Sequence, residues 1–125
     1  MTTVFILSYN SLGLDFWKNH LELSGSDRVS QFRSGQDCVK SLNHEPSLII
    51  IDDYFANSPE DDAGSEEVIQ IINEIMPDVK VFHISPRNCG SEMTHGHMKF
   101  VCSNFNQDVI TDINETLNSK RIIAA

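Results

Sequence analysis

Two short, uninterrupted apolar runs constrain the fold of this chain more than any other feature. Val4–Leu7 lies near the start, and Leu48–Ile51 lies in the middle, within the sequence PSLIIIDDY. Both runs are too short and too rich in β-branched residues to be helices, so they predict strands. Apolar residues without polar alternation indicate that both faces of a strand are buried, as in the centre of a parallel sheet. We therefore expect helices on both faces of a sheet.

Further strands and helices alternate along the 125 residues. Three more strands are predicted, at Arg28–Phe32, Val79–Ser85 and Lys99–Ser103. Segments of helical period separate the strands, and the sequence predicts helix starts after Ser11 and Ser34, at residue 65 and at about Asn106. The apolar stripe of the third of these helices comprises Val68, Ile69, Ile72, Ile75 and Met76. This order predicts an α/β fold with a doubly wound, five-stranded parallel sheet between two helix layers, a flavodoxin-like three-layer sandwich.

Charge and cysteine content exclude several classes of protein. The net charge is −9, and residues 41–79 hold ten Asp and Glu but no Lys or Arg. Such a chain repels polyanions, so we expect neither direct nucleic-acid binding nor membrane binding. Three widely spaced cysteines favour a reducing, cytoplasmic location over a disulfide framework. The absence of nucleotide-binding and hydrolase motifs predicts a protein that is not an enzyme.

The segment SGQDCVKSLNHEPSLIIIDD is the most specific in the chain. It resembles the second helix and third strand of response-regulator receiver domains, the phosphoacceptor modules of two-component signalling. In this resemblance Asp52 stands at the phosphorylated aspartate, while Ser85 and Phe100 stand at the family's switch pair. The likeness spans nearly the whole chain. It implies a single receiver-like domain over residues 1–125, either the N-terminal part of a longer regulator or a stand-alone adaptor.

Three positions of the family's phosphorylation pocket depart from its pattern. Ser8 and Tyr9 stand where the family has two acidic residues, and Ser103 stands where it has a lysine. Mg²⁺ prefers carboxylate oxygens, so Asp52 and Asp53 are left as weak candidate ligands. Each lost charged partner typically costs about 3 kcal/mol of transition-state stabilisation, or roughly a hundredfold in rate. We therefore expect a degenerate, pseudo-receiver domain that requires no cofactor and binds Mg²⁺ at most weakly.

Two connections also differ from the family. The chain runs twelve residues from Asp52 to Gly64, which predicts a long loop after the third strand. Only ten residues separate Ser85 from Gly96, and their content of Pro, Gly and Asn predicts a short or mobile fourth helix.

The sequence leaves more than one function open. The favoured function is regulation through contacts with a protein partner, whether a sensor kinase, an output domain or a second copy in a homodimer. The alternative is a working phosphorelay receiver, phosphorylated on Asp52 by a histidine kinase, with Asp53 helping to rebuild the metal site. A flavin carrier fits the expected fold, but the chain lacks a Ser/Thr-rich phosphate loop after the first strand.

Overall fold

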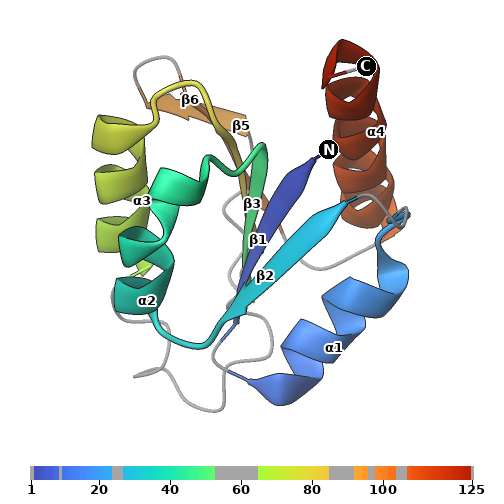
Figure 1. Cartoon of the computed structure of the whole chain (residues 1–125), viewed down its shortest axis with the longest axis horizontal. Coiled ribbons are helices and arrows are strands. Elements are labelled where there is room, and N and C mark those ends of the chain that lie inside the picture. Colours follow the sequence, from blue (N-terminus) through green and yellow to red (C-terminus); the bar gives the residue numbers. More distant parts are fainter. Residues whose placement is uncertain are drawn as a thin grey trace.

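A single mixed sheet with helices on both faces forms the protein (Figure 1). The computed structural model describes residues 2–8, 10–23, 27–52, 65–84, 92–95, 98–103 and 107–124, with the backbone alone for 65–66, 92–95, 98–103 and 120–124. The strands are β1 (Thr3–Ser8), β2 (Arg28–Phe32), β3 (Leu48–Asp52), β4 (Lys80–Ile84), β5 (Glu92–His95) and β6 (Met98–Ser103). The helices are α1 (Ser11–His20), α2 (Gly35–Lys40), α3 (Ser65–Ile75) and α4 (Gln107–Ala124), with a short 3₁₀ helix, η1, at Leu42–His44.

The parallel part of the sheet confirms the flavodoxin-like arrangement. Strand order is β2-β1-β3-β4-β6-β5. β1 pairs in parallel with β2 and β3, β3 pairs with β4, and β4 pairs with β6. β1, β3 and β4 are central strands, and their nearly continuous burial agrees with the uninterrupted apolar runs.

The five predicted strands are all present and parallel, but the sheet has one strand more than predicted. A sixth strand, β5, lies at the edge and pairs antiparallel with β6, from His95 opposite Met98 to Glu92 opposite Val101. The prediction of a short helix between the fourth and fifth predicted strands is therefore wrong over Glu92–His95, where the chain is extended. Only two residues, the first of them glycine, link β5 to β6 in the sequence, and a link of this length favours a hairpin. The remainder of that segment and the predicted long loop fall in 85–91 and 53–64, outside the described residues.

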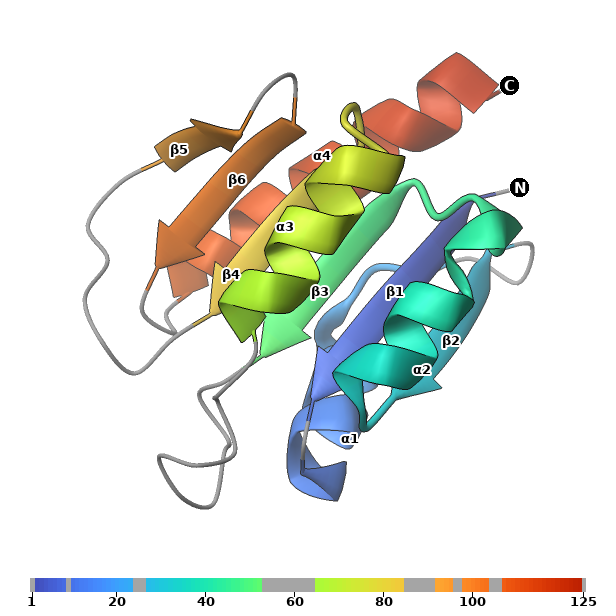
Figure 2. The same cartoon turned by 90° about the vertical axis from the view of Figure 1, so that its left-hand side faces the viewer.

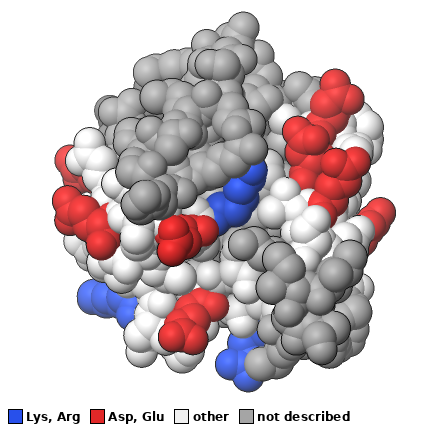
Figure 3. Space-filling view, turned by 90° about the horizontal axis from the view of Figure 1, so that it is seen from above, with Lys and Arg blue, Asp and Glu red and all other residues white. Residues whose placement is uncertain are grey.

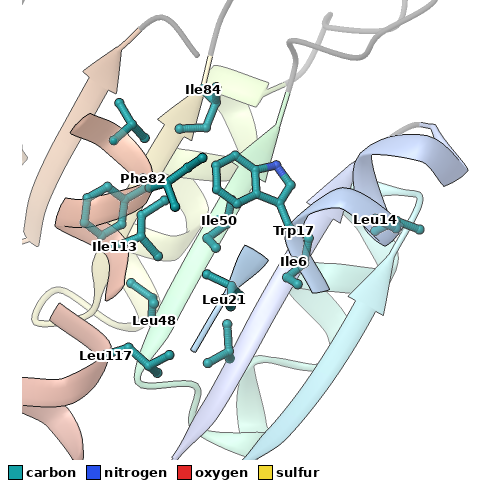
Figure 4. Close-up of a cluster of buried hydrophobic side chains, with 13 residues drawn as sticks. Ile6, Leu14, Trp17, Leu21, Leu48, Ile50, Phe82, Ile84, Ile113 and Leu117 are labelled. Carbon is teal, nitrogen blue, oxygen red and sulfur yellow. The ribbon is translucent and has the colours of Figure 1, made fainter. Parts of the chain in front are cut away.

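Two hydrophobic clusters fill the layers on either side of the sheet. Alternation along β1 sends Phe5 and Leu7 to one cluster, with residues of α2 and α3, and Val4 and Ile6 to the other, with residues of α1 and α4. Figure 2 shows α2 and α3 in front of the sheet, with α1 and α4 behind it. The second cluster surrounds the indole of Trp17, which extends from α1 over Ile50 of β3 (Figure 4). Among the described helices, none is long and apolar enough to cross a membrane.

The helices follow the sequence with two corrections, one to the cap of α1 and one to the burial of Ile75 in α3. Ser34 caps α2 as expected, since its Oγ accepts from the Asp37 amide at 3.3 Å. The cap of α1 is Asn10 rather than Ser11, because the Asn10 Oδ1 accepts from the Leu12 amide at 2.7 Å, and asparagine is as good a cap as serine. In α3, Ile75 is 57% exposed instead of buried, because it lies on the flank of the stripe that packs on the sheet.

Cys38 gives a prediction about thiol chemistry. Its side chain is entirely buried in the cluster beneath α2 and α3, and burial raises its pKa from 9.0 to about 12. At about pH 8 the folded protein should therefore protect Cys38 from iodoacetamide, as measured by peptide mass mapping, and urea should abolish the protection. Because the folded pKa lies above the unfolded one, this thiol stabilises the fold fully below pH 9, and the contribution is lost as pH rises towards 12. Rapid alkylation of Cys38 in the folded protein would contradict this prediction.

Candidate functional site

The candidate site lies at the carboxyl ends of four adjacent parallel strands. Asp52, the last residue of β3, is in register with Ser8 of β1 on one side and with Ile84 of β4 on the other. Ile84 is in turn in register with Ser103 of β6. Ser8, Asp52 and Ser103 therefore occupy one row across the sheet, as the sequence predicts. Open α/β sheets bind their ligands at this edge.

Trp17 makes the central contact of the site. Its indole Nε1 donates a hydrogen bond to Oδ2 of Asp52 at 2.6 Å, and both side chains are 0% exposed. A hydrogen bond to a carboxylate is stronger than one between neutral groups, and a low-dielectric surrounding strengthens it further. The carboxylate that the sequence resemblance sets at the phosphoacceptor position is thus covered and held by α1.

Gly13 brings the backbone of α1 against the same carboxylate. A Cβ atom built on Gly13 would overlap Oγ of Ser8 and would lie 3.0 Å from Oδ2 of Asp52. Gly13 itself is buried. Only glycine allows this approach, so the first turn of α1 closes the site from the β1 side.

The Ser8 hydroxyl is engaged with the start of α1. Its Oγ donates to the Asn10 carbonyl at 3.3 Å and accepts from the Asn10 amide at 3.4 Å. Ser8 is also 0% exposed. Ser8, which the sequence resemblance sets at an acidic position, therefore binds the backbone of Asn10 and offers no carboxylate.

The described residues do not fit the Mg²⁺ site that the resemblance implies. Mg²⁺ requires near-octahedral oxygen ligands, normally including more than one carboxylate. Here Oδ2 of Asp52 already accepts from Trp17, and Ser8 supplies only a hydroxyl. In the part of the chain with described side chains, no group of three or more His, Cys, Asp or Glu residues is placed to hold a metal ion.

The other predicted site residues have less structural support. Tyr9, Asp53 and Ser85 lie outside the described residues. The backbone of Phe100 lies in β6, in register with Val81, and its side chain is not described. The structure brings Ser8 and Asp52 together through the sheet.

Sequence reasoning missed the role of Trp17. The prediction placed it only on the apolar stripe of the first helix. A signal was available, because a buried tryptophan normally finds an acceptor for its N–H, and this chain has a single tryptophan. That signal calls for an acceptor near the first helix but does not identify Asp52, which lies 35 positions away in the sequence.

Comparison with known proteins supports the fold. No family model matches the sequence, and no curated protein matches it. A response regulator receiver protein from Sinorhizobium medicae WSM419 matches with a TM-score of 0.64 and 17% identity over 94% of each chain. A CheY-like receiver domain protein from Methanospirillum hungatei JF-1 matches with a TM-score of 0.63 and 14% identity over 97% of each chain.

A third match is RcsB from Salmonella enterica serovar Typhimurium, solved bound to promoter rprA in the presence of the phosphomimetic BeF₃⁻. It has a TM-score of 0.61 and 14% identity, over 95% of this chain and 61% of that one. The chain therefore has the fold of response-regulator receiver domains.

Proposed function

We propose that this chain is a receiver-like signalling module that acts through protein contacts and does not use Mg²⁺-dependent phosphorylation of Asp52. The observation that carries the proposal is the buried hydrogen bond between Trp17 Nε1 and Asp52 Oδ2. In this proposal the module has no catalytic turnover of its own and no resident cofactor. The receiver-like fold and the residues Ser8 and Ser103 in place of charged groups support it.

The carboxylate of Asp52 is closed to reactants in this structure. A nucleophilic Asp52 would have to meet a phosphodonor and a cation, yet its side chain is 0% exposed. Freeing it means breaking a charge-assisted hydrogen bond worth about 1.5–3 kcal/mol. It also means moving the Trp17 ring out of its apolar cluster, since the ring lies against the carboxylate. Without a large movement of α1, both reactants are excluded.

The test is a titration with Mg²⁺ and beryllofluoride, followed by amide NMR. RcsB, solved in the presence of BeF₃⁻, serves as the positive control. Under conditions that saturate RcsB, we expect no saturable shift at Asp52 or its neighbours and an unchanged Trp17 indole resonance. Saturable binding that disappears in Asp52→Asn would overturn the proposal.

The alternative, a phosphorelay receiver with Asp52 as phosphoacceptor, draws support from the place of Asp52 at the end of β3. It predicts phosphate incorporation from a small phosphodonor such as acetyl phosphate, lost in Asp52→Asn. Intact-mass spectrometry of the wild type and of this variant distinguishes the two functions. Under our proposal neither protein gains the mass of a phosphoryl group.

A further inference from the structure

An apolar patch flanked by carboxylates lies on the solvent-exposed side of α3. Ile71 is 37% exposed and Ile75 is 57% exposed. Three residues neighbour Ile71 on the helix surface: Glu67 and Ile75 are four positions away, and Glu74 is three positions away. Both glutamates are exposed. We call Glu67, Ile71, Glu74 and Ile75 the α3 patch.

The packing of α3 does not require these isoleucines. Val68, Ile69 and Ile72 supply its buried face, with exposures of 7%, 3% and 0%. Ile71 and Ile75 are the exposed large apolar residues of this helix, and two of them on adjacent turns form a continuous apolar strip. Exposed apolar side chains framed by charged ones are typical of surfaces that meet a partner.

The charged residues of α3 itself are all acidic, whereas the neighbouring helix α2 ends in Lys40. The stretch 41–79 holds ten acidic residues and no Lys or Arg, and it includes all of α3. Lys80, the next basic residue along the chain, has its ammonium over the Phe82 ring, and Phe82 belongs to the cluster on the opposite side of the sheet. Figure 3 shows carboxylates at both the left-hand and the right-hand rim, with a basic side chain below those on the left. The patch therefore complements a positively charged surface.

We propose that the α3 patch docks a basic amphipathic helix of a partner protein. Apolar residues of that helix would cover Ile71 and Ile75, and its Lys or Arg side chains would meet Glu67 and Glu74. Burial of aliphatic surface would supply most of the affinity, while the charges would select the partner and accelerate the encounter. A second copy of this chain fits less well, since it would bring its own carboxylates against these. This inference rests on the proposed function, because it names a surface for the protein contacts.

The probe is a fluorescent amphipathic helical peptide of leucine and lysine. A peptide of the same pattern with glutamate in place of lysine tests the sign of the charge. A peptide with the leucine and lysine composition scrambled controls for non-specific attraction to an acidic protein. We expect saturable binding of the first peptide only, with amide shifts concentrated on α3. Added salt should weaken the binding, because the paired charges lie at the surface.

Variants of exposed residues keep the fold intact and locate the site. Ile75→Ser should weaken binding about tenfold, which corresponds to about 1.4 kcal/mol. Glu74→Gln should reduce the salt dependence. Leu12→Ser is the matched control, because Leu12 is 69% exposed but lies on α1, behind the opposite face of the sheet. It should leave binding unchanged.

Two results would overturn the docking inference: equal binding by the Ile75→Ser variant and the wild type, or shifts spread over α1 and α4. A dimer in sedimentation that Ile75→Ser dissociates would assign the patch to a second copy and would also overturn it. None of these results changes the beryllofluoride titration. Failure of this inference is therefore distinct from failure of the proposed function.

Discussion

Trp17→Ala is expected to lower the free energy of unfolding by about 3–5 kcal/mol, measured by urea denaturation. The indole is 0% exposed and belongs to the cluster between the sheet and helices α1 and α4, so its removal leaves a large cavity. The substitution also deletes the donor to Oδ2 of Asp52, a carboxylate that is itself 0% exposed. Desolvation of a carboxylate that has lost a buried donor adds to the loss of packing.

A control at Lys18 and a double-mutant cycle between Trp17 and Asp52 separate the causes of this loss. Lys18→Ala changes the next residue of α1, which is exposed, and should shift stability by less than about 0.5 kcal/mol. Trp17→Phe keeps an aromatic ring but removes the indole N–H. It should lower the free energy of unfolding by more than the smaller ring volume alone accounts for. Asp52→Ala removes the acceptor, so if Trp17→Phe were no less costly in that background, the hydrogen bond would have no role in stability. If Trp17→Ala lowered the free energy of unfolding by no more than Lys18→Ala does, the result would contradict the buried position of the indole.

Most of the sheet could be predicted because its signals are local. Burial on both faces makes strands such as Leu48–Asp52 apolar throughout, and that pattern identifies the strand and its central position together. Asp52 follows such a strand, so its place at the edge of the sheet also follows from the sequence. The parallel register then brings Ser8 beside it without further information.

The features that could not be predicted depend on contacts between distant segments. The hydrogen bond from Trp17 to Asp52 joins residues 35 positions apart, and no periodicity encodes the orientation of an indole. The strand β5 exists because β6 provides a partner for it, whereas composition alone suggested a poor helix. Ile75 matched the apolar spacing of α3, but the surface that α3 covers is narrower than its apolar stripe.

Gly13→Ala should lower the free energy of unfolding by about 1–3 kcal/mol, the usual range for overpacking. Glycine within a helix normally costs about 1 kcal/mol relative to alanine, so the same change elsewhere would stabilise the protein. At Gly13 the new Cβ would overlap Oγ of Ser8 and lie 3.0 Å from Oδ2 of Asp52. The helix would have to move away from the sheet, which would stretch the contact between Trp17 and Asp52. Urea denaturation and the indole N–H resonance report the two effects separately.

Gly35→Ala is the matched control, because Gly35 opens α2 and is only partly buried, and it should be neutral or stabilising. Ser8→Ala removes the atom that a Cβ on Gly13 would overlap, although the Ser8 Cβ itself would still lie at 3.2 Å. The double variant of Ser8 and Gly13 should therefore lose less stability than the sum of the two single losses. Strict additivity, or a stabilised Gly13→Ala protein, would contradict the close approach of α1 to Asp52.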